Sequence, residues 1–271
     1  RLGENRNERK QFSSETESAN NEEEPFDNII KKMEETQMDT ISISLDGLKE
    51  THESFRKVPG SFDKIIENIK KLQKVPTIRA VQVTTVVNKK NINELEEMYK
   101  LMQDLNVISW RVINVDAIGN AKDNKDILLD KEDYKYLFNF IKEKRRENLL
   151  NVEFGCAHYL GIELEKELRD TYFICCAGIY IASILHNGDI SVCPDVELKK
   201  ELAQGNIKTD DFVDVWENKF QIFRTEKRTQ NEKCQNCPSW QYCCGDAYHT
   251  WNFETGKPNF CIREIYEDLE I

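Results

Sequence analysis

The chain has 271 residues, of which 39% are hydrophobic, so it can bury a core large enough for one large domain or two ordinary ones. Its 38 lysines and arginines against 49 aspartates and glutamates give a formal net charge of −11 at pH 7. This charge argues against nucleic acid and membrane as partners, because both demand local positive potential. The longest nearly apolar stretch, residues 172–185, is too short to span a bilayer. No signal peptide is evident, so we expect a cytoplasmic protein, although a leader upstream of Arg1 stays open.

Residues 1–24 contain only Leu2, Phe12 and Ala19 as apolar side chains among many charges. Such a segment cannot bury enough surface to offset the entropy lost on ordering. We interpret it as a disordered lead-in, or as a remnant whose structural partner lies upstream.

From Pro25 onward the pattern alternates between helix and strand. Helical spacing begins at Pro25, and strand-like segments follow at residues 41–45, 78–87, 107–115 and 151–154. Ser61, Asn93 and Asp130 precede the intervening helices as candidate N-caps. Short connections between these elements predict right-handed βαβ units and a parallel sheet. Four strands do not close a barrel, so the segment is either a small open sheet or the latter part of a longer (β/α) barrel.

After Cys156 the alternation stops, and a domain boundary is expected near residues 155–175. Residues 178–185 and 190–193 flank Asn187-Gly188, a strong signal for an antiparallel hairpin, because both central turn positions need positive φ. Thr209 or Asp210 is expected to cap an amphipathic helix. The patterns indicate the α/β class: a small open sheet or part of a (β/α) barrel, followed by a small cysteine-rich α+β domain.

Eight of the nine cysteines lie between Cys156 and Cys244, which favours metal ligation over a disulfide framework. The run Cys234-x2-Cys237-x5-Cys243-x17-Cys261 supplies four thiols, suited equally to zinc and to a [4Fe–4S] cluster. A second group flanks the hairpin. There Cys176 and Cys193 are expected to be ligands, and Cys175 is interpreted as a small buried hydrophobe.

These motifs together resemble a known family. The order Cys176-x11-Gly188-x4-Cys193, Cys234-x2-Cys237-x5-Cys243 and Cys261 resembles the SPASM domain of radical S-adenosylmethionine (SAM) peptide and protein maturases, with six of its seven cysteines in place. Residues 42–72 are similar to the fourth-strand region of the radical SAM barrel, and residues 110–122 are similar to its sixth strand. Residues 204–224 are similar to the SPASM linker helix. The resemblance implies three parts: a lead-in (1–24), a partial radical SAM barrel (25–155) and a SPASM auxiliary iron–sulfur domain (156–271).

The resemblance also implies ligand sets. It assigns Cys234, Cys237, Cys243 and Cys261 to the second auxiliary [4Fe–4S] cluster. It gives the first auxiliary cluster Cys176 and Cys193, with further ligands drawn from Cys156, Cys175, Cys244 and His249. Of these, Cys156 is favoured over Cys175, because adjacent side chains on a strand point apart, and a packing role is favoured for His249.

Other site residues follow from the same resemblance. Ser44, at the end of its strand, is expected near the ribose of S-adenosylmethionine and Arg56 near its charged groups, since strand C-terminal ends face the active site in such barrels. A strand serine and a surface arginine are the structural alternative. We interpret Asp195 as a loop residue and His52, His158 and His186 as structural or solvated.

Two departures from the family pattern stand out. The CxxxCxxC motif that binds the S-adenosylmethionine cluster and the GGE segment are absent. Truncation is the simplest explanation, and a degenerate homologue is the alternative. The cysteine expected after Cys243 falls at Ala247, so the first auxiliary cluster needs a substitute ligand or keeps an open iron.

In intact form the resemblance implies an enzyme that reduces S-adenosylmethionine on its own [4Fe–4S] cluster and abstracts hydrogen from a peptide or protein substrate. A reductant such as flavodoxin or ferredoxin would supply electrons. This chain alone is not expected to perform that step. The alternatives are a non-catalytic module that binds a precursor peptide and a zinc-binding structural domain.

Overall fold

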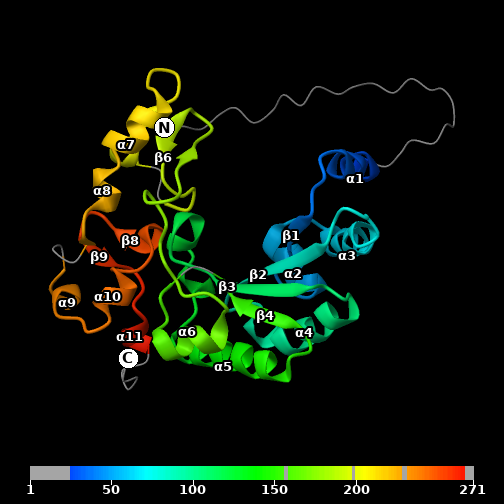
Figure 1. The fold of residues 1–271 in the computed structure, drawn as a ribbon. Coiled ribbons are helices and arrows are strands. Elements are labelled where there is room, and N and C mark those ends of the chain that lie inside the picture. The colour runs from blue at the N-terminus through cyan, green and yellow to red at the C-terminus, as the bar shows by residue number, and fades with distance from the viewer. Residues whose placement is uncertain (1–24, 156–157, 197–198, 228–230, 266–271) are drawn as a thin grey trace, which may run out of the picture.

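The computed structural model describes residues 25–155, 158–196, 199–227 and 231–265 (Figure 1). The predicted lead-in (1–24) and the candidate ligand Cys156 therefore lie outside the described residues. Within this part of the chain, no helix is long and apolar enough to cross a membrane.

The first half forms a parallel four-stranded sheet with the order β1-β2-β3-β4. Its strands are β1 (Thr40–Ser44), β2 (Ala80–Val87), β3 (Ser109–Asn114) and β4 (Asn151–Phe154). The helices are α1 (Pro25–Glu35), α2 (Lys49–Arg56), α3 (Ser61–Leu72), α4 (Leu95–Asp104) and α5 (Lys131–Glu147). Short 3₁₀ turns lie at η1 (Ile92–Glu94), η2 (Gly119–Lys122) and η3 (Lys125–Ile127). The four predicted strands and the α/β class are confirmed, and sequential parallel order is the arrangement of a (β/α) barrel segment.

Helix starts follow the cap prediction only in part. Asp130 caps α5 in a capping box with Asp133, as predicted. The predicted cap Ser61 is wrong: Gly60, at φ 75°, precedes the helix, and Ser61 is already its first residue. Asn93 was also wrong as a cap, because it lies inside η1 and α4 begins after Glu94.

The two faces of the sheet differ in polarity. One face is packed against the helices, and its residues belong to one core with those of α3, α4 and α5: Val81, Val83, Trp110, Val112, Val152 and Phe154. The other face carries half-buried or exposed polar side chains: Ser42, Ser44, Gln82, Thr84, Arg111 and Glu153. In a complete barrel this polar face would line the interior.

The second half is built from short elements. Its first members are α6 (Ile162–Leu168), β5 (Ser183–Ile184), β6 (Asp189–Ser191), η4 (Lys200–Leu202), β7 (Gly205–Asn206), α7 (Phe212–Asn218) and α8 (Gln221–Arg224). The last are α9 (Glu232–Gln235), α10 (Trp240–Cys243), η6 (Tyr248–Thr250), β8 (Trp251–Asn252), β9 (Lys257–Pro258) and α11 (Ile262–Ile265). The predicted hairpin is confirmed as the antiparallel pair β5–β6, which a third strand, β7, extends. The cap of α7 is Asp211, one residue after Asp210 and two after Thr209, the predicted positions.

A second core holds this half together, formed by residues including Ile190, Val192, Val215, Phe220 and Phe223. The last helix, α11, instead joins the first core, where Ile262 and Ile265 are buried. In Figure 1, α11 lies beside α5, below the elements β8 and β9. The C-terminal segment thus returns to the sheet half, and the boundary at residue 155/156 stays a prediction.

Candidate metal centre

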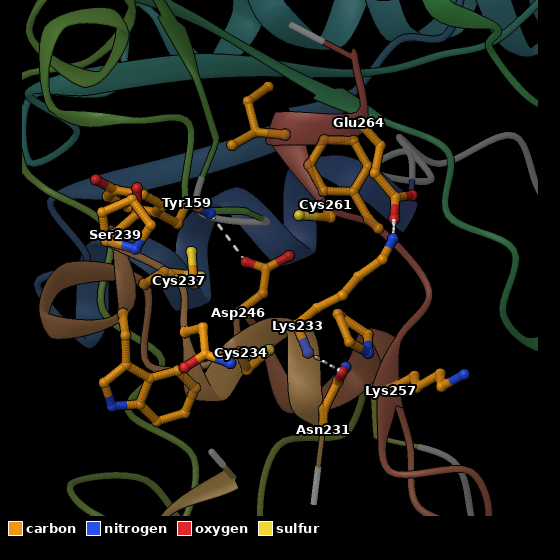
Figure 2. A pocket seen from close by; sticks show the side chains of 18 of the residues that line it. Tyr159, Asn231, Lys233, Cys234, Cys237, Ser239, Asp246, Lys257, Cys261 and Glu264 are labelled. Atoms are coloured by element: carbon orange, nitrogen blue, oxygen red, sulfur yellow. Dashed lines mark hydrogen bonds and ion pairs between the residues drawn. The ribbon is translucent and has the colours of Figure 1, made fainter. Parts of the chain in front are cut away.

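Four cysteines line one cavity of about 710 Å³ in the C-terminal half: Cys234, Cys237, Cys243 and Cys261 (Figure 2). They come from three segments, namely α9 and the turn after it, the end of α10, and the residue before α11. The structure thus brings together the four thiols that the spacing grouped.

Local hydrogen bonds fix this arrangement. The Asn231 side chain caps α9 by accepting from the backbone N of Lys233, at 3.0 Å. The backbone N of Cys237 donates to the carbonyl of Cys234, at 3.3 Å, so a tight turn carries both thiols. After Cys243, three successive residues have positive φ, namely Cys244 (49°), Gly245 (82°) and Asp246 (65°). They end α10 sharply and keep Cys243 at the cavity wall.

The thiols of this group are near enough to influence one another. Burial, together with the charges of Cys261 and Cys237, raises the pKa of Cys234. Burial and then the charge of Asp246 raise the pKa of Cys243 well above its usual range. Thiolates gathered in such a place need positive charge, and metal binding would supply it while releasing protons.

The geometry also bears on the kind of metal. Among the described residues, no three histidine, cysteine, aspartate or glutamate side chains surround the position of one metal ion. A single zinc draws its ligands to about 2.0–2.3 Å from one point. The four cysteines of a [4Fe–4S] cluster instead each bind a different iron, so they stand around a larger volume. The four thiols line one cavity but do not form a ligand group for a single ion among the described residues, so their arrangement excludes no cluster of the second kind.

The second cysteine group lies around the hairpin. The Cys193 thiol lies 3.7 Å from a carboxylate oxygen of Asp195, and the Cys176 thiol lies 3.6 Å from the carbonyl of Ile174. Burial raises the pKa of Cys193, and the charges of Asp195 and Cys175 add to this rise. Cys175 contacts both cores, and its sulfur accepts a hydrogen bond from the backbone N of Tyr248, at 3.4 Å. Cys175 is thus a neighbour of Cys193 as well as a packed side chain.

Two further positions, 247 and 249, bear on the predicted first cluster. Ala247, where the family places a cysteine, is buried in the first core. The His249 ring faces Asp116 across the domain junction, with Nε2 3.4 Å from its carboxylate. Cys244 is exposed and lines a second cavity of about 830 Å³ together with Cys175 and Cys243.

Of the two residues predicted to meet S-adenosylmethionine, Ser44 lies at the carboxyl end of β1 and Arg56 lies on the helix that follows it. Ser44 is exposed on the polar face of the sheet. Arg56, at the end of α2, donates through Nε to Asp46, at 2.5 Å, and Asp46 is fully buried. A carboxylate oxygen of Asp46 also accepts from the backbone N of Val86, at 2.8 Å. Arg56 is therefore anchored to the loop after β1 rather than free on the surface.

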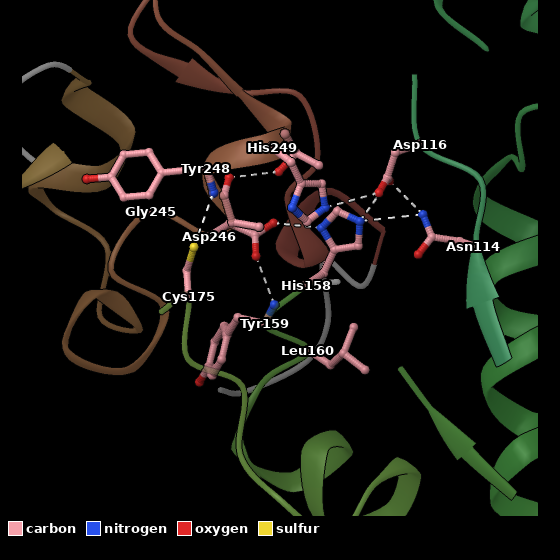
Figure 3. A network of polar contacts seen from close by, with 12 residues as sticks. Asn114, Asp116, His158, Tyr159, Leu160, Cys175, Gly245, Asp246, Tyr248 and His249 are labelled. Carbon is pink, nitrogen blue, oxygen red and sulfur yellow. Dashed lines mark hydrogen bonds and ion pairs between the residues drawn. The ribbon is translucent and has the colours of Figure 1, made fainter. Parts of the chain in front are cut away.

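Sequence reasoning missed a buried polar network between the halves (Figure 3). His158 is fully buried; its Nδ1 lies 2.8 Å from Asp246 and its Nε2 lies 2.8 Å from Asp116. Asn114, at the end of β3, donates to Asp116 at 2.7 Å, and the backbone N of Tyr159 donates to Asp246 at 2.9 Å. Of the two alternatives for His158, structural or solvated, the structure shows the first, and the two carboxylate partners were not predicted. Asp116, which directly follows the β3 region, was the one sequence signal available, because strand ends meet at one edge.

The network is charged. Burial alone would lower the pKa of His158, but Asp246 and Asp116 outweigh it and raise the pKa to about 9. Burial would raise the pKa of Asp116, but hydrogen bonds from His158 and His249 outweigh it and hold that pKa far below its usual range. An imidazolium between two carboxylates therefore joins the sheet half to the cysteine-rich half.

A parallel sheet joined to a cavity lined by four cysteines defines an α/β protein with a candidate metal centre. Residues 4–102 match the Radical SAM superfamily, and residues 175–238 match SPASM, described as an iron-sulfur cluster-binding domain. The chain thus contains one segment that matches the Radical SAM model and one that matches the SPASM model, and these two matches imply S-adenosylmethionine and iron–sulfur clusters as cofactors.

Individual relatives are in line with these two matches. The chain is 24% identical over 234 residues to the AdoMet-dependent heme synthase of Methanosarcina barkeri, covering 80% of this chain and 64% of that protein. It is 27% identical over 227 residues to the cysteine-type anaerobic sulfatase-maturating enzyme of Clostridium novyi, covering 81% and 59%. The structure of anSMEcpe with bound AdoMet and Cp18Cys peptide is similar with a TM-score of 0.64 at 17% identity, covering 89% of this chain and 68% of that one. The chain thus spans less than two thirds of the length of both curated relatives.

Proposed function

We propose that this chain is part of a radical SAM maturase that modifies a peptide or protein by hydrogen abstraction. We further propose that Cys234, Cys237, Cys243 and Cys261 bind an auxiliary [4Fe–4S] cluster. The observation that carries this proposal is the convergence of these four thiols on one cavity, within a chain that matches SPASM. Such a cluster, when bound, accepts an electron or binds substrate.

The chain's own residues would prepare the site for that chemistry. The polar face of the sheet, which includes Ser44 and Thr84, would line the barrel interior. Arg56, fixed by Asp46, would present its remaining guanidinium donors to the charged groups of S-adenosylmethionine. The His158 network closes the junction between this face and the cysteine-rich half against water, because His158 and Asp246 are almost fully buried.

For the first auxiliary cluster we propose Cys176 and Cys193 as ligands, with Cys156 as the third. Cys175 also becomes a strong candidate, because it neighbours Cys193 and its sulfur receives a backbone N–H. Hydrogen bonds of that kind to a ligating sulfur are a usual means of tuning iron–sulfur clusters.

The chain lacks the CxxxCxxC motif, so on its own it is not expected to cleave S-adenosylmethionine reductively. Incubation with S-adenosylmethionine and dithionite should yield no 5′-deoxyadenosine by chromatography. Product formation above a no-protein blank would contradict this expectation. In a complete enzyme, a flavodoxin or ferredoxin in the cytoplasm would act as the electron donor.

A second candidate substrate class is a tetrapyrrole, because three curated relatives are named AdoMet-dependent heme synthases. Titration of the protein with iron-coproporphyrin III separates the two classes. A saturable shift of the porphyrin absorption band would favour the tetrapyrrole, and no shift is expected for a peptide maturase.

The cluster assignment is tested by anaerobic reconstitution with iron and sulfide. Brown protein with acid-labile sulfide is expected, and its Cys237→Ala variant should bind less iron. Colourless protein that contains zinc without sulfide would refute the assignment and favour the structural zinc domain.

A further inference from the structure

The second cavity, which Cys175, Cys243 and Cys244 line, also contains a buried cation, Lys227. Only 5% of this residue is exposed. Its ammonium donates to the carbonyl oxygen of Gly245, at 3.1 Å, and to that of Asp246. It also lies 4.1 Å from the ring centroid of Tyr248 and 5.0 Å from that of Trp251. The ammonium is thus held in one place by two carbonyls and two aromatic faces.

The fixed position depends on Gly245. A Cβ at this residue would lie 3.2 Å from both Cβ and Cε of Lys227, and 3.3 Å from the Trp251 ring. The backbone there has φ 82°, which side-chain-bearing residues rarely adopt. The lysine stem therefore passes directly over the backbone that follows Cys243 and Cys244.

Within the described ranges, no carboxylate forms an ion pair with Lys227. The Asp246 side chain, whose charge acts on Lys227, is instead bonded to His158 and to the backbone N of Tyr159. Burial lowers the pKa of Lys227, whereas the charges of Cys175 and Asp246 oppose that fall. A buried cation without an acidic partner is costly unless negative charge is placed near it.

That negative charge is available from the cysteines. Lys227 interacts electrostatically with Cys175, Cys243 and Cys244, and its charge also acts on Cys234. Two of these thiols, Cys234 and Cys243, line the cavity assigned to the auxiliary cluster. A [4Fe–4S] cluster with four thiolate ligands carries net negative charge, and one more when it is reduced.

We propose that Lys227 is a positioning residue for electron transfer, whose fixed charge raises the reduction potential of the cluster held by Cys234, Cys237, Cys243 and Cys261. The inference rests on the proposed function and deepens it. Charge near an iron–sulfur cluster is one of the factors that set its potential. A buried charge acts more strongly than an exposed one, because solvent screens the latter.

The test is an EPR-monitored redox titration of reconstituted Lys227→Met. At the wild-type midpoint potential we expect the ratio of reduced to oxidised cluster to be about tenfold lower in this variant than in the wild type, a shift of about 59 mV to more negative potential for a one-electron couple. The matched control is Lys233→Met, because Lys233 also acts on Cys234 but is 79% exposed and paired with Glu264. The Lys233→Met variant should change the ratio of reduced to oxidised cluster at that potential less than twofold.

Each outcome decides the question. An unchanged midpoint in Lys227→Met, or an equal shift in Lys233→Met, would overturn the inference. If Lys227→Met assembles no cluster, the Lys227→Arg variant decides. A cluster retained in Lys227→Arg but not in Lys227→Met supports a requirement for positive charge. Loss of the cluster in both variants assigns Lys227 to packing and overturns the inference. Absence of iron and sulfide from the wild-type protein would instead overturn the proposed function.

Discussion

Substitution of Asp246 by asparagine tests the charged junction between the two halves. The change removes one of the two carboxylates that hold the His158 imidazolium but keeps an oxygen that can accept from the backbone N of Tyr159. In the wild type, the pKa of His158 rises from 6.5 to about 9. At 1.36 kcal/mol per pKa unit, this rise corresponds to roughly 3 kcal/mol of folding free energy.

The sign and the pH window follow from the direction of the shift. A folded-state pKa above the unfolded one stabilises the protein fully below about pH 6.5, and the contribution is lost as pH rises through about 9. Asp246 is the larger of the two carboxylate influences on His158, so Asp246→Asn should lower the free energy of unfolding by about 2 kcal/mol at pH 6. The difference from wild type should shrink steadily between pH 6.5 and pH 9.

Urea unfolding followed by circular dichroism at pH 6, 7.5 and 9.5 measures this difference. The matched control is Asp39→Asn, because Asp39 forms an exposed pair with Arg79 and should change little at any of these pH values. A penalty for Asp246→Asn that stays constant from pH 6 to pH 9.5 would show that no buried imidazolium is involved. No penalty at all would show that the network does not stabilise the junction.

Two further substitutions test the cysteine-rich half. Cys237→Ala should lose bound iron and lower the unfolding midpoint of the reconstituted protein, because metal binding there contributes to the folding free energy. The control variant Ser239→Ala, in the same cavity, should keep its iron content. Equal loss of iron in both variants would count against Cys237 as a ligand. Gly178→Ala should cost roughly 3 kcal/mol in urea unfolding, because the backbone has φ 74° and the new Cβ would lie 2.5 Å from Cβ of Phe223. Gly60→Ala, at φ 75° but with open space around it, should cost only about 1 kcal/mol, and equal costs would refute the packing argument.

The sheet was predictable because its signals are local. The alternation of β-branched residues in 80–87 and the run at 109–114 fix strands whatever the rest of the chain does. The starts of α3 and α4 were not predictable in the same way. A glycine at positive φ, Gly60, takes the position before α3 that Ser61 was expected to hold, and a 3₁₀ turn contains Asn93 before α4 begins. Polar residues near a helix start predict a cap only to within a residue or two.

Some residues of the candidate site could be predicted from the sequence and others could not. Cys234, Cys237 and Cys243 lie within ten residues, so their spacing alone indicated a shared ligand set. His158 could not be predicted, because its partners lie 42 and 88 residues away in the chain. Lys227 is one of many lysines in a strongly charged sequence, and only its burial distinguishes it.

The central claim is that four cysteines of the C-terminal half bind a [4Fe–4S] cluster. Mössbauer spectroscopy of ⁵⁷Fe-reconstituted protein, with iron and sulfide analysis, tests it most directly. We predict at least one [4Fe–4S] spectrum with about four iron and four sulfide per cluster, diminished by one cluster when Cys234 and Cys261 are both replaced by alanine. Protein that binds only zinc, or an iron spectrum unchanged by that double substitution, would contradict the claim.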